Sequence, residues 1–234
     1  MPFFFFDWTF YLLIPALLLA LWAQGRVKSA YARYSQVAAA AGMPGATVAR
    51  QLLDRNGLQN VGIEEVPGDL SDHYDPRTRT VRLSAANYHQ PSLAGLAVAA
   101  HECGHAVQHA KAYAPLAFRT AFFPVAGFGS RMAIPLFFIG FLFSAGGGGN
   151  LTVLMDIGIL LFAAFVVFNL VTLPVEFDAS RRALAMLQGS GYMSQTEVGG
   201  ARKVLNAAAW TYVAAATMAL LQMVRLIVLR GFRD

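Results

Sequence analysis

Four long apolar stretches constrain this chain more than any other feature of its sequence. They cover residues 3–23, 122–143, 151–173 and 207–229. A helix needs about 20 mostly apolar residues to cross the ~30 Å hydrocarbon core of a bilayer. The sequence therefore predicts four transmembrane helices.

The composition narrows the class of protein further. Hydrophobic residues make up 56% of the 234 positions and charged residues 13%, whereas soluble domains carry about 45–50% and about 25%. This excludes a disordered chain and disfavours a simple soluble enzyme. The net charge is +5, but no dense basic run with interleaved aromatics accompanies it, so nucleic acid is not an expected partner. The single cysteine, Cys103, excludes an internal disulfide framework.

Two polar segments, residues 24–115 and 174–206, separate the apolar stretches. In the first, hydrophobic spacing predicts a short helix over 45–57, strands over 61–66 and 80–83, and a helix over 93–111 with Ser92 as its N-cap. Residues 174–206 are expected to be helical. The expected fold is mainly α and integral to the membrane, with a small α+β segment.

Basic residues set the expected orientation. Lysine and arginine concentrate in the two polar segments, and the Gly-rich turn at 144–150 carries none. By the positive-inside rule, both polar segments face the cytoplasm and both termini lie outside. Arg230 and Arg233 argue mildly against this orientation. We expect a multi-pass protein of the cell (plasma) membrane.

The strongest chemical signal is an H-E-x-x-H motif at residues 101–105. On a helix, His101 and His105 share one face and can present two imidazoles to one ion. Zinc accepts two histidines and a carboxylate while leaving one position open for water. Glu102 can reach a water at that open position as a general base. The alternative is a chance match on an ordinary helix, since five-residue motifs occur by accident.

A two-histidine zinc site needs a third protein ligand, and Glu176 is the candidate. It follows the third apolar stretch and lies on the same expected side of the membrane as His101. The alternative is that Glu176 pairs with Arg181 or Arg182 on a solvated helix face.

Three segments, AAHECGHAVQH, LPVEFDASRRA and DHYDPRTRTVRLS, carry a family resemblance. Together they resemble the YugP-like membrane zinc metallopeptidases over nearly the whole chain. The second segment is also similar to the E-x-x-x-D helix of membrane gluzincin proteases related to the CAAX prenyl protease and HtpX. The resemblance implies a gluzincin-like domain, one Zn²⁺ ion, Glu176 as third ligand, and a protein or peptide substrate, membrane proteins included.

The resemblance also suggests residues around the ligands. Ser180 stands where those relatives carry an aspartate and is expected to contact a ligand histidine, as a weaker partner. Independently of the resemblance, Arg181 and Arg182 are candidates for polarising a scissile carbonyl or binding a substrate carboxylate, with plain solvated charges as the alternative. The strand around Val81 is expected to be a sheet edge that aligns an extended substrate.

Three neighbouring residues are not expected to bind the metal. His109 continues the helix face of His105 but lies about 12 Å along the axis from His101. Cys103 faces the opposite side of the helix. His73 is expected in a loop or hairpin.

The sequence thus predicts a membrane-embedded zinc metalloendopeptidase. A non-catalytic membrane adaptor or scaffold with a structural metal is the alternative, which Glu102 disfavours because a structural site needs no base. An intramembrane site-2-type protease is also disfavoured, because the apolar run 93–100 before His101 is too short to span. Beyond the bilayer and the substrate, protein regulators or a homo-oligomer stay open as partners.

Overall fold

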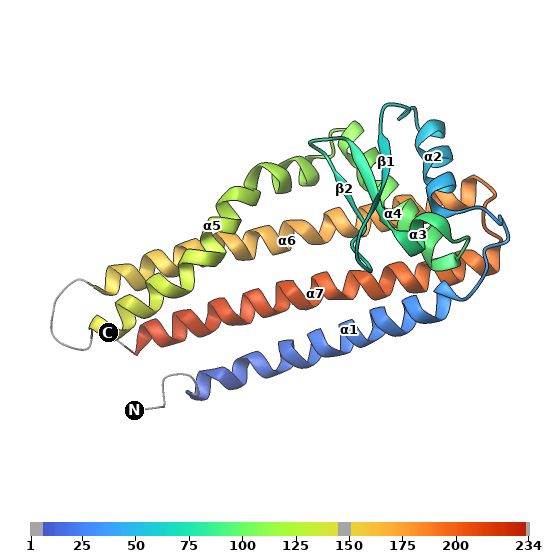
Figure 1. Ribbon diagram of the computed structural model, residues 1–234. Coiled ribbons are helices and arrows are strands. Elements are labelled where there is room, and N and C mark those ends of the chain that lie inside the picture. Colours follow the sequence, from blue (N-terminus) through green and yellow to red (C-terminus); the bar gives the residue numbers. More distant parts are fainter. Residues whose placement is uncertain (1–6, 145–150, 233–234) are drawn as a thin grey trace. The chain divides into compact units, whose positions relative to one another are not determined.

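The computed structural model of the chain describes residues 7–144 and 151–232 and is mainly helical (Figure 1). A 3-10 helix (Trp8–Leu13) precedes the other elements in this order: α1 (Ile14–Ser35), α2 (Gly45–Arg55), β1 (Gly62–Val66), β2 (His73–Asp75), β3 (Thr80–Ser84), α3 (Ala85–His89), α4 (Leu93–Ala110), α5 (Ala114–Phe143), α6 (Thr152–Gly189) and α7 (Gln195–Gly231). The expected class, mainly α with a small sheet, is confirmed.

Within residues 7–144 and 151–232, four helical segments are long and apolar enough to cross a membrane. They are Trp8–Ser35, Ala114–Phe143, Thr152–Gly189 and Gln195–Gly231. The expectation of four such helices is confirmed. Residues 3–6 of the first apolar stretch and 145–150 of the Gly-rich turn lie outside the described residues.

The long helices extend well beyond the apolar stretches. Helix α6 continues through Pro174, so one helix carries both the third apolar stretch and Glu176. Helices α5 and α7 likewise begin at Ala114 and Gln195, before their apolar stretches. The changes from polar to apolar sequence near residues 122, 173 and 207 therefore lie within helices and do not mark helix ends.

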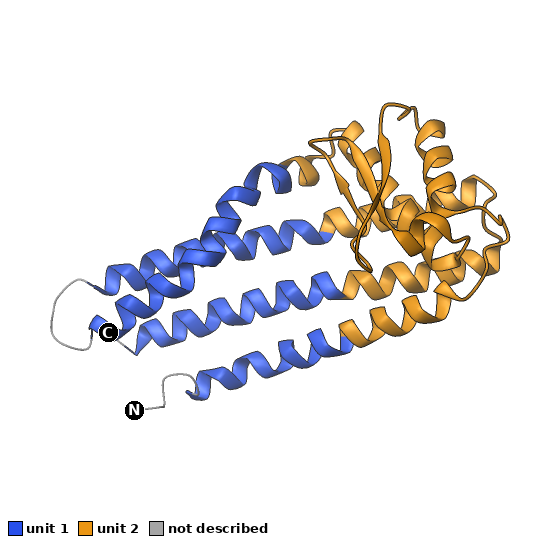
Figure 2. Cartoon of the chain, viewed as in Figure 1, with its two compact units in different colours: residues 1–22, 118–173, 211–234 blue, residues 23–117, 174–210 orange. Residues whose placement is uncertain are grey.

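The chain forms two compact units (Figure 2). Unit 1 takes its described residues from 1–22, 118–173 and 211–234, and unit 2 comprises 23–117 and 174–210. In unit 1, side chains of α5, α6 and α7 form one apolar core. Its buried members are Ala133, Phe137, Met155, Phe162, Val166, Ala219, Leu226 and Leu229.

Helix α4 lies at the centre of unit 2. Its first turn is capped by Ser92, whose hydroxyl accepts a hydrogen bond from the Gly95 amide at 3.0 Å. Its apolar faces pack against α2, β3 and α6. The buried side chains of this core include Val48, Leu52, Leu53, Val81, Leu83, Leu96, Ala97, Ala100, Ala183 and Leu187. Burial on several sides fixes the position of the helix that carries both motif histidines.

The three strands are ordered β1-β3-β2, with β1 parallel and β2 antiparallel to β3. Val81 pairs with Ile63 on one side and Tyr74 on the other, and its exposed fraction is 0%. The expectation that the strand around Val81 is a free edge is wrong. Its second neighbour, β2, is a three-residue strand that contains His73, the residue expected in a loop or hairpin.

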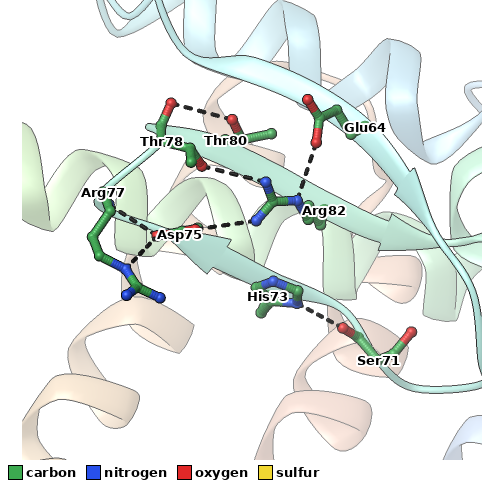
Figure 3. A network of polar contacts seen from close by, with 8 residues as sticks. All are labelled: Glu64, Ser71, His73, Asp75, Arg77, Thr78, Thr80 and Arg82. Carbon is green, nitrogen blue, oxygen red and sulfur yellow. Dashed lines mark hydrogen bonds and ion pairs between the residues drawn. The ribbon is translucent and has the colours of Figure 1, made fainter. Parts of the chain in front are cut away.

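One arginine connects all three strands (Figure 3). Arg82 of β3 donates to Glu64 of β1 at 3.0 Å and to Asp75 of β2 at 3.2 Å. Asp75 also accepts a hydrogen bond from the Arg77 amide at 2.9 Å. A sheet of three short strands can bury only a small apolar area. These polar contacts therefore help to stabilise the strand order.

Candidate metal centre

His101, His105 and Glu176 come together in unit 2, between α4 and α6. The Nε2 atom of His101 lies 3.2 Å from Glu176 Oε2, and that of His105 lies 3.5 Å from the same oxygen. One donor atom from each residue falls within 4.8 Å of the other two. The two imidazole planes are nearly perpendicular, at 86°. Among the described residues, these three form a group that can hold one metal ion.

The spacing of the donor atoms fits zinc. Zinc binds histidine nitrogen at 2.0–2.1 Å and carboxylate oxygen at 2.0–2.2 Å, so two donors at tetrahedral positions lie about 3.3 Å apart. The observed separations of 3.2 and 3.5 Å agree with this geometry. Two imidazoles and one carboxylate are also the donor set typical of zinc sites that keep an open position.

A glycine allows the two helices to approach closely. A Cβ atom at Gly104 would lie 2.6 Å from the backbone oxygen of Ala179 on α6, a distance that real Cβ atoms do not adopt. Since Gly104 lies between His101 and His105, this contact brings both imidazoles to Glu176.

Each motif histidine has a polar partner at its second ring nitrogen. Ser180 Oγ lies 3.2 Å from His101 Nδ1, so Ser180 is placed where the resemblance implied. For His105 the partner is Gln108, whose Oε1 lies 3.0 Å from Nδ1. Gln108 was not predicted as a functional residue from the sequence. Its position three residues after His105, on the same helix face, is the signal that could have found it.

Arg181 and Arg182 both contact the carboxylate of Asp178. Gln108 Nε2 donates to the same carboxylate at 2.9 Å. The Arg181 side chain is nevertheless 77% exposed, whereas that of Arg182 is 23% exposed. Asp178, to which the sequence assigned no role, therefore links both arginines to the surroundings of His105.

Burial changes the proton affinity of the groups on α4. Glu102, only 7% exposed, has a pKa above its ordinary value because burial disfavours the carboxylate, although His101 and His105 oppose this. For His105, burial lowers the pKa, but the contact with Glu176 outweighs it and the pKa is raised. A carboxylate with a raised pKa is a stronger base.

The remaining candidates lie away from the three donors. Cys103 is fully buried in the core of unit 2, and burial raises the pKa of its thiol, which disfavours a thiolate ligand. His109 is exposed, with Nδ1 2.8 Å from the Tyr74 hydroxyl. His73 lies in β2 and contacts the Ser71 backbone oxygen.

Apolar helices long enough to span a membrane, combined with an H-E-x-x-H helix and a glutamate on a second helix, define a class of membrane-associated zinc metallopeptidase. Comparison with known proteins agrees. The family described as "Putative neutral zinc metallopeptidase" matches residues 9–231, and the chain belongs to this family.

One curated relative resembles the chain over nearly its full length. It is "Putative membrane protease YugP" of Bacillus subtilis (strain 168), which is 47% identical over 219 residues, 94% of this chain and 95% of the relative. No solved structure matches the chain. The recognition of a YugP-like family from three sequence motifs is thereby confirmed.

Proposed function

We propose that this chain is a membrane-embedded zinc metalloendopeptidase that hydrolyses peptide bonds in protein or peptide substrates. The observation that supports this most is the convergence of His101, His105 and Glu176 at zinc-compatible distances. The buried carboxyl of Glu102, adjacent to His101, supports catalysis over a purely structural metal, because a structural site needs no base.

The roles of the residues follow from their positions. His101, His105 and Glu176 would hold one zinc ion, which when bound supplies Lewis-acid chemistry toward water and the peptide carbonyl. Glu102 accepts the proton of the attacking water and passes it to the leaving amine. Ser180 holds the imidazole of His101 through Nδ1. Burial of the group limits access of other waters.

A groove beside the site is a candidate surface for the substrate. It lies between α6 and α7, has a volume of about 380 Å³, and is lined in part by Ser180, Arg181 and Arg202. Since Ser180 also contacts His101, the groove begins next to the ligand group. We propose that Arg181 contacts the substrate here, while Arg182 acts through Asp178.

We place the chain in the plasma membrane, with the catalytic site on the cytoplasmic side. The basic segments 24–115 and 174–206 carry the site, and the positive-inside rule assigns them to the cytoplasm. Reporter fusions at the C-terminus and within 144–150 test this orientation. Both reporters are expected outside, and a cytoplasmic reporter at 144–150 would contradict the proposal.

Glu102→Gln tests the catalytic proposal. The amide keeps the size of the side chain but cannot accept the water's proton, so proteolysis of casein or of membrane substrates should be abolished. Bound zinc should remain at the wild-type amount. Full activity in this variant would reject Glu102 as the base. Zinc binding without hydrolysis in the wild-type chain under any condition would instead favour the scaffold alternative.

A further inference from the structure

Gln108 is a polar side chain buried inside the contact between α4 and α6. Its exposed fraction is 0%. Its amide makes three hydrogen bonds, to the Val175 backbone oxygen at 2.8 Å, to Asp178 Oδ2 at 2.9 Å, and with His105 Nδ1 at 3.0 Å. A buried side-chain amide lowers the stability of a protein unless it is hydrogen-bonded. The amide nitrogen and the amide oxygen of Gln108 both have hydrogen-bond partners.

The partners settle which way the amide points. The Val175 backbone oxygen can only accept a hydrogen bond, so it must face the amide nitrogen of Gln108. The Asp178 carboxylate accepts the second hydrogen of the same nitrogen. Both N–H groups of Gln108 are then used, and its oxygen faces His105. Arg181 and Arg182 also contact the Asp178 carboxylate and help to fix its position.

The amide direction in turn settles the protonation of one ring nitrogen. The oxygen of Gln108 can only accept, so Nδ1 of His105 must carry a hydrogen. A neutral imidazole with its hydrogen on Nδ1 presents the lone pair of Nε2. That Nε2 atom is the one that lies 3.5 Å from Glu176. We infer that Gln108 is a positioning residue that commits His105 to bind the metal through Nε2.

The partner of His101 does not impose the same restriction. A serine hydroxyl can donate or accept, so the 3.2 Å contact between Ser180 Oγ and His101 Nδ1 is compatible with either ring form. Gln108 is therefore the partner that determines ligand orientation, and it does so through Val175 and Asp178 on the helix that supplies Glu176. This inference rests on the proposed zinc site.

The first experiment measures zinc affinity by chelator competition on the full chain in lipid nanodiscs. Gln108→Leu should bind zinc about 10- to 100-fold more weakly, the loss typical of outer partners of metal ligands. The matched control is Gln188→Leu, which makes the same change at an exposed glutamine on helix α6 and should leave the zinc affinity unchanged. Equal affinity in wild type and Gln108→Leu would overturn the inference.

A spectroscopic readout separates positioning from a merely structural role. In the zinc-loaded, ¹⁵N-histidine-labelled chain, His105 should show a slowly exchanging proton on Nδ1, assigned by its loss in His105→Gln. Gln108→Leu should expose that proton to rapid exchange. Zinc bound through Nδ1 of His105 in the wild type would overturn the inference directly.

A conservative pair of substitutions guards against simple misfolding of Gln108→Leu. Gln108→Glu keeps an acceptor for His105 but loses the donors to Val175 and Asp178, and Asp178→Asn supplies a donor in return for the second contact only. The double variant should therefore recover the Nδ1 proton and part of the zinc affinity, and failure to recover the Nδ1 proton in a folded double variant would contradict the inference. A wild-type chain that binds no zinc would overturn the proposed function together with the inference, whereas unchanged affinity in Gln108→Leu overturns the inference alone.

Discussion

In unit 1, Arg225 contacts Asp7 and Arg230 contacts Asp156, so each of these guanidinium groups has a carboxylate beside it. At the candidate site of unit 2, the Glu176 carboxylate contacts the imidazoles of His101 and His105. An imidazole carries a full positive charge only when protonated. The two units therefore place carboxylates beside different basic groups. Those of unit 1 are guanidinium groups, which are always charged, and those of unit 2 are imidazoles, which are charged only when protonated.

This difference indicates different roles for the carboxylates of unit 1 and for Glu176. A carboxylate paired with arginine already has a permanent counter-charge, so removing one partner of the pair should destabilise its unit. A carboxylate grouped with two imidazoles can be completed by a metal cation, so we expect this group to contribute to metal binding. Substitutions in unit 1 should then change the free energy of unfolding, and substitutions at the site should change zinc affinity.

The largest effect is expected for Glu176→Gln. The variant loses the anionic donor and keeps two imidazoles, so zinc affinity should fall by more than the roughly 10- to 100-fold loss expected of an outer partner. Bound zinc per chain, measured after equilibration against a zinc buffer, checks this. Glu65→Gln, at an exposed acid of β1, is the control. Wild-type zinc content in Glu176→Gln at low free zinc would remove Glu176 from the ligand group.

Gly104→Ala should affect stability and binding together. The added methyl group would lie 2.6 Å from the Ala179 backbone oxygen, so α4 and α6 must move apart. We expect a loss of about 1–3 kcal/mol in the free energy of unfolding and weaker zinc binding. Gly199→Ala on α7, where a Cβ atom meets nothing within 4 Å, should be neutral or stabilising. Thermal unfolding with parallel zinc titration distinguishes the two, and equal behaviour would contradict the close-approach argument.

Much of this site could be predicted because its signals are local. The H-E-x-x-H spacing fixes two imidazoles on one helix face, whatever surrounds the helix. Apolar stretches of sufficient length likewise indicate membrane helices without knowledge of their neighbours. The grouping of Glu176 with His101 and His105 depends on long-range packing. Glu176 was a candidate because it follows the third apolar stretch, on the expected side of the membrane, and because the family resemblance implied the same role.

The features that escaped prediction depend on contacts between distant segments. Strand order is one example, because the pattern of Val81 indicates burial but does not say that β2 covers its second side. The continuation of α6 through Pro174 is another, since local rules favour a break at proline. Gln108 has an ordinary polar side chain in sequence, and only the nearness of Val175 and Asp178 gives it a role.

Arg225→Met tests the unit 1 side of the comparison. Arg225 is 6% exposed and donates to both Thr9 and Asp7, so its loss leaves polar groups without their partner. The free energy of unfolding should fall by roughly 1–2 kcal/mol. Zinc affinity should stay at the wild-type value, and a parallel loss of zinc binding would show that stability and binding are not separable between the units. Adding Asp7→Asn should recover part of the stability.

The smallest effect is expected for Asp75→Asn. Asp75 pairs with Arg82, so this variant tests a carboxylate–arginine pair like those of unit 1, but within unit 2. The Arg77 amide, followed by Arg82, lowers the pKa of Asp75 against the opposing effect of burial. A carboxyl whose pKa is lower in the folded state stabilises the fold above its unfolded pKa of about 3.9. That stabilisation is lost as the pH falls through the folded pKa.

Wild type should therefore lose slightly more stability than Asp75→Asn when the pH is lowered from about 6 to about 3. The difference should stay below about 1 kcal/mol, as is usual for solvent-accessible ion pairs. Thermal unfolding of both proteins across this pH range measures it, with zinc affinity at neutral pH as the control. Identical pH profiles would mean that the Asp75–Arg82 contact does not stabilise the sheet. A change in zinc affinity would instead connect the sheet's charges to the metal site.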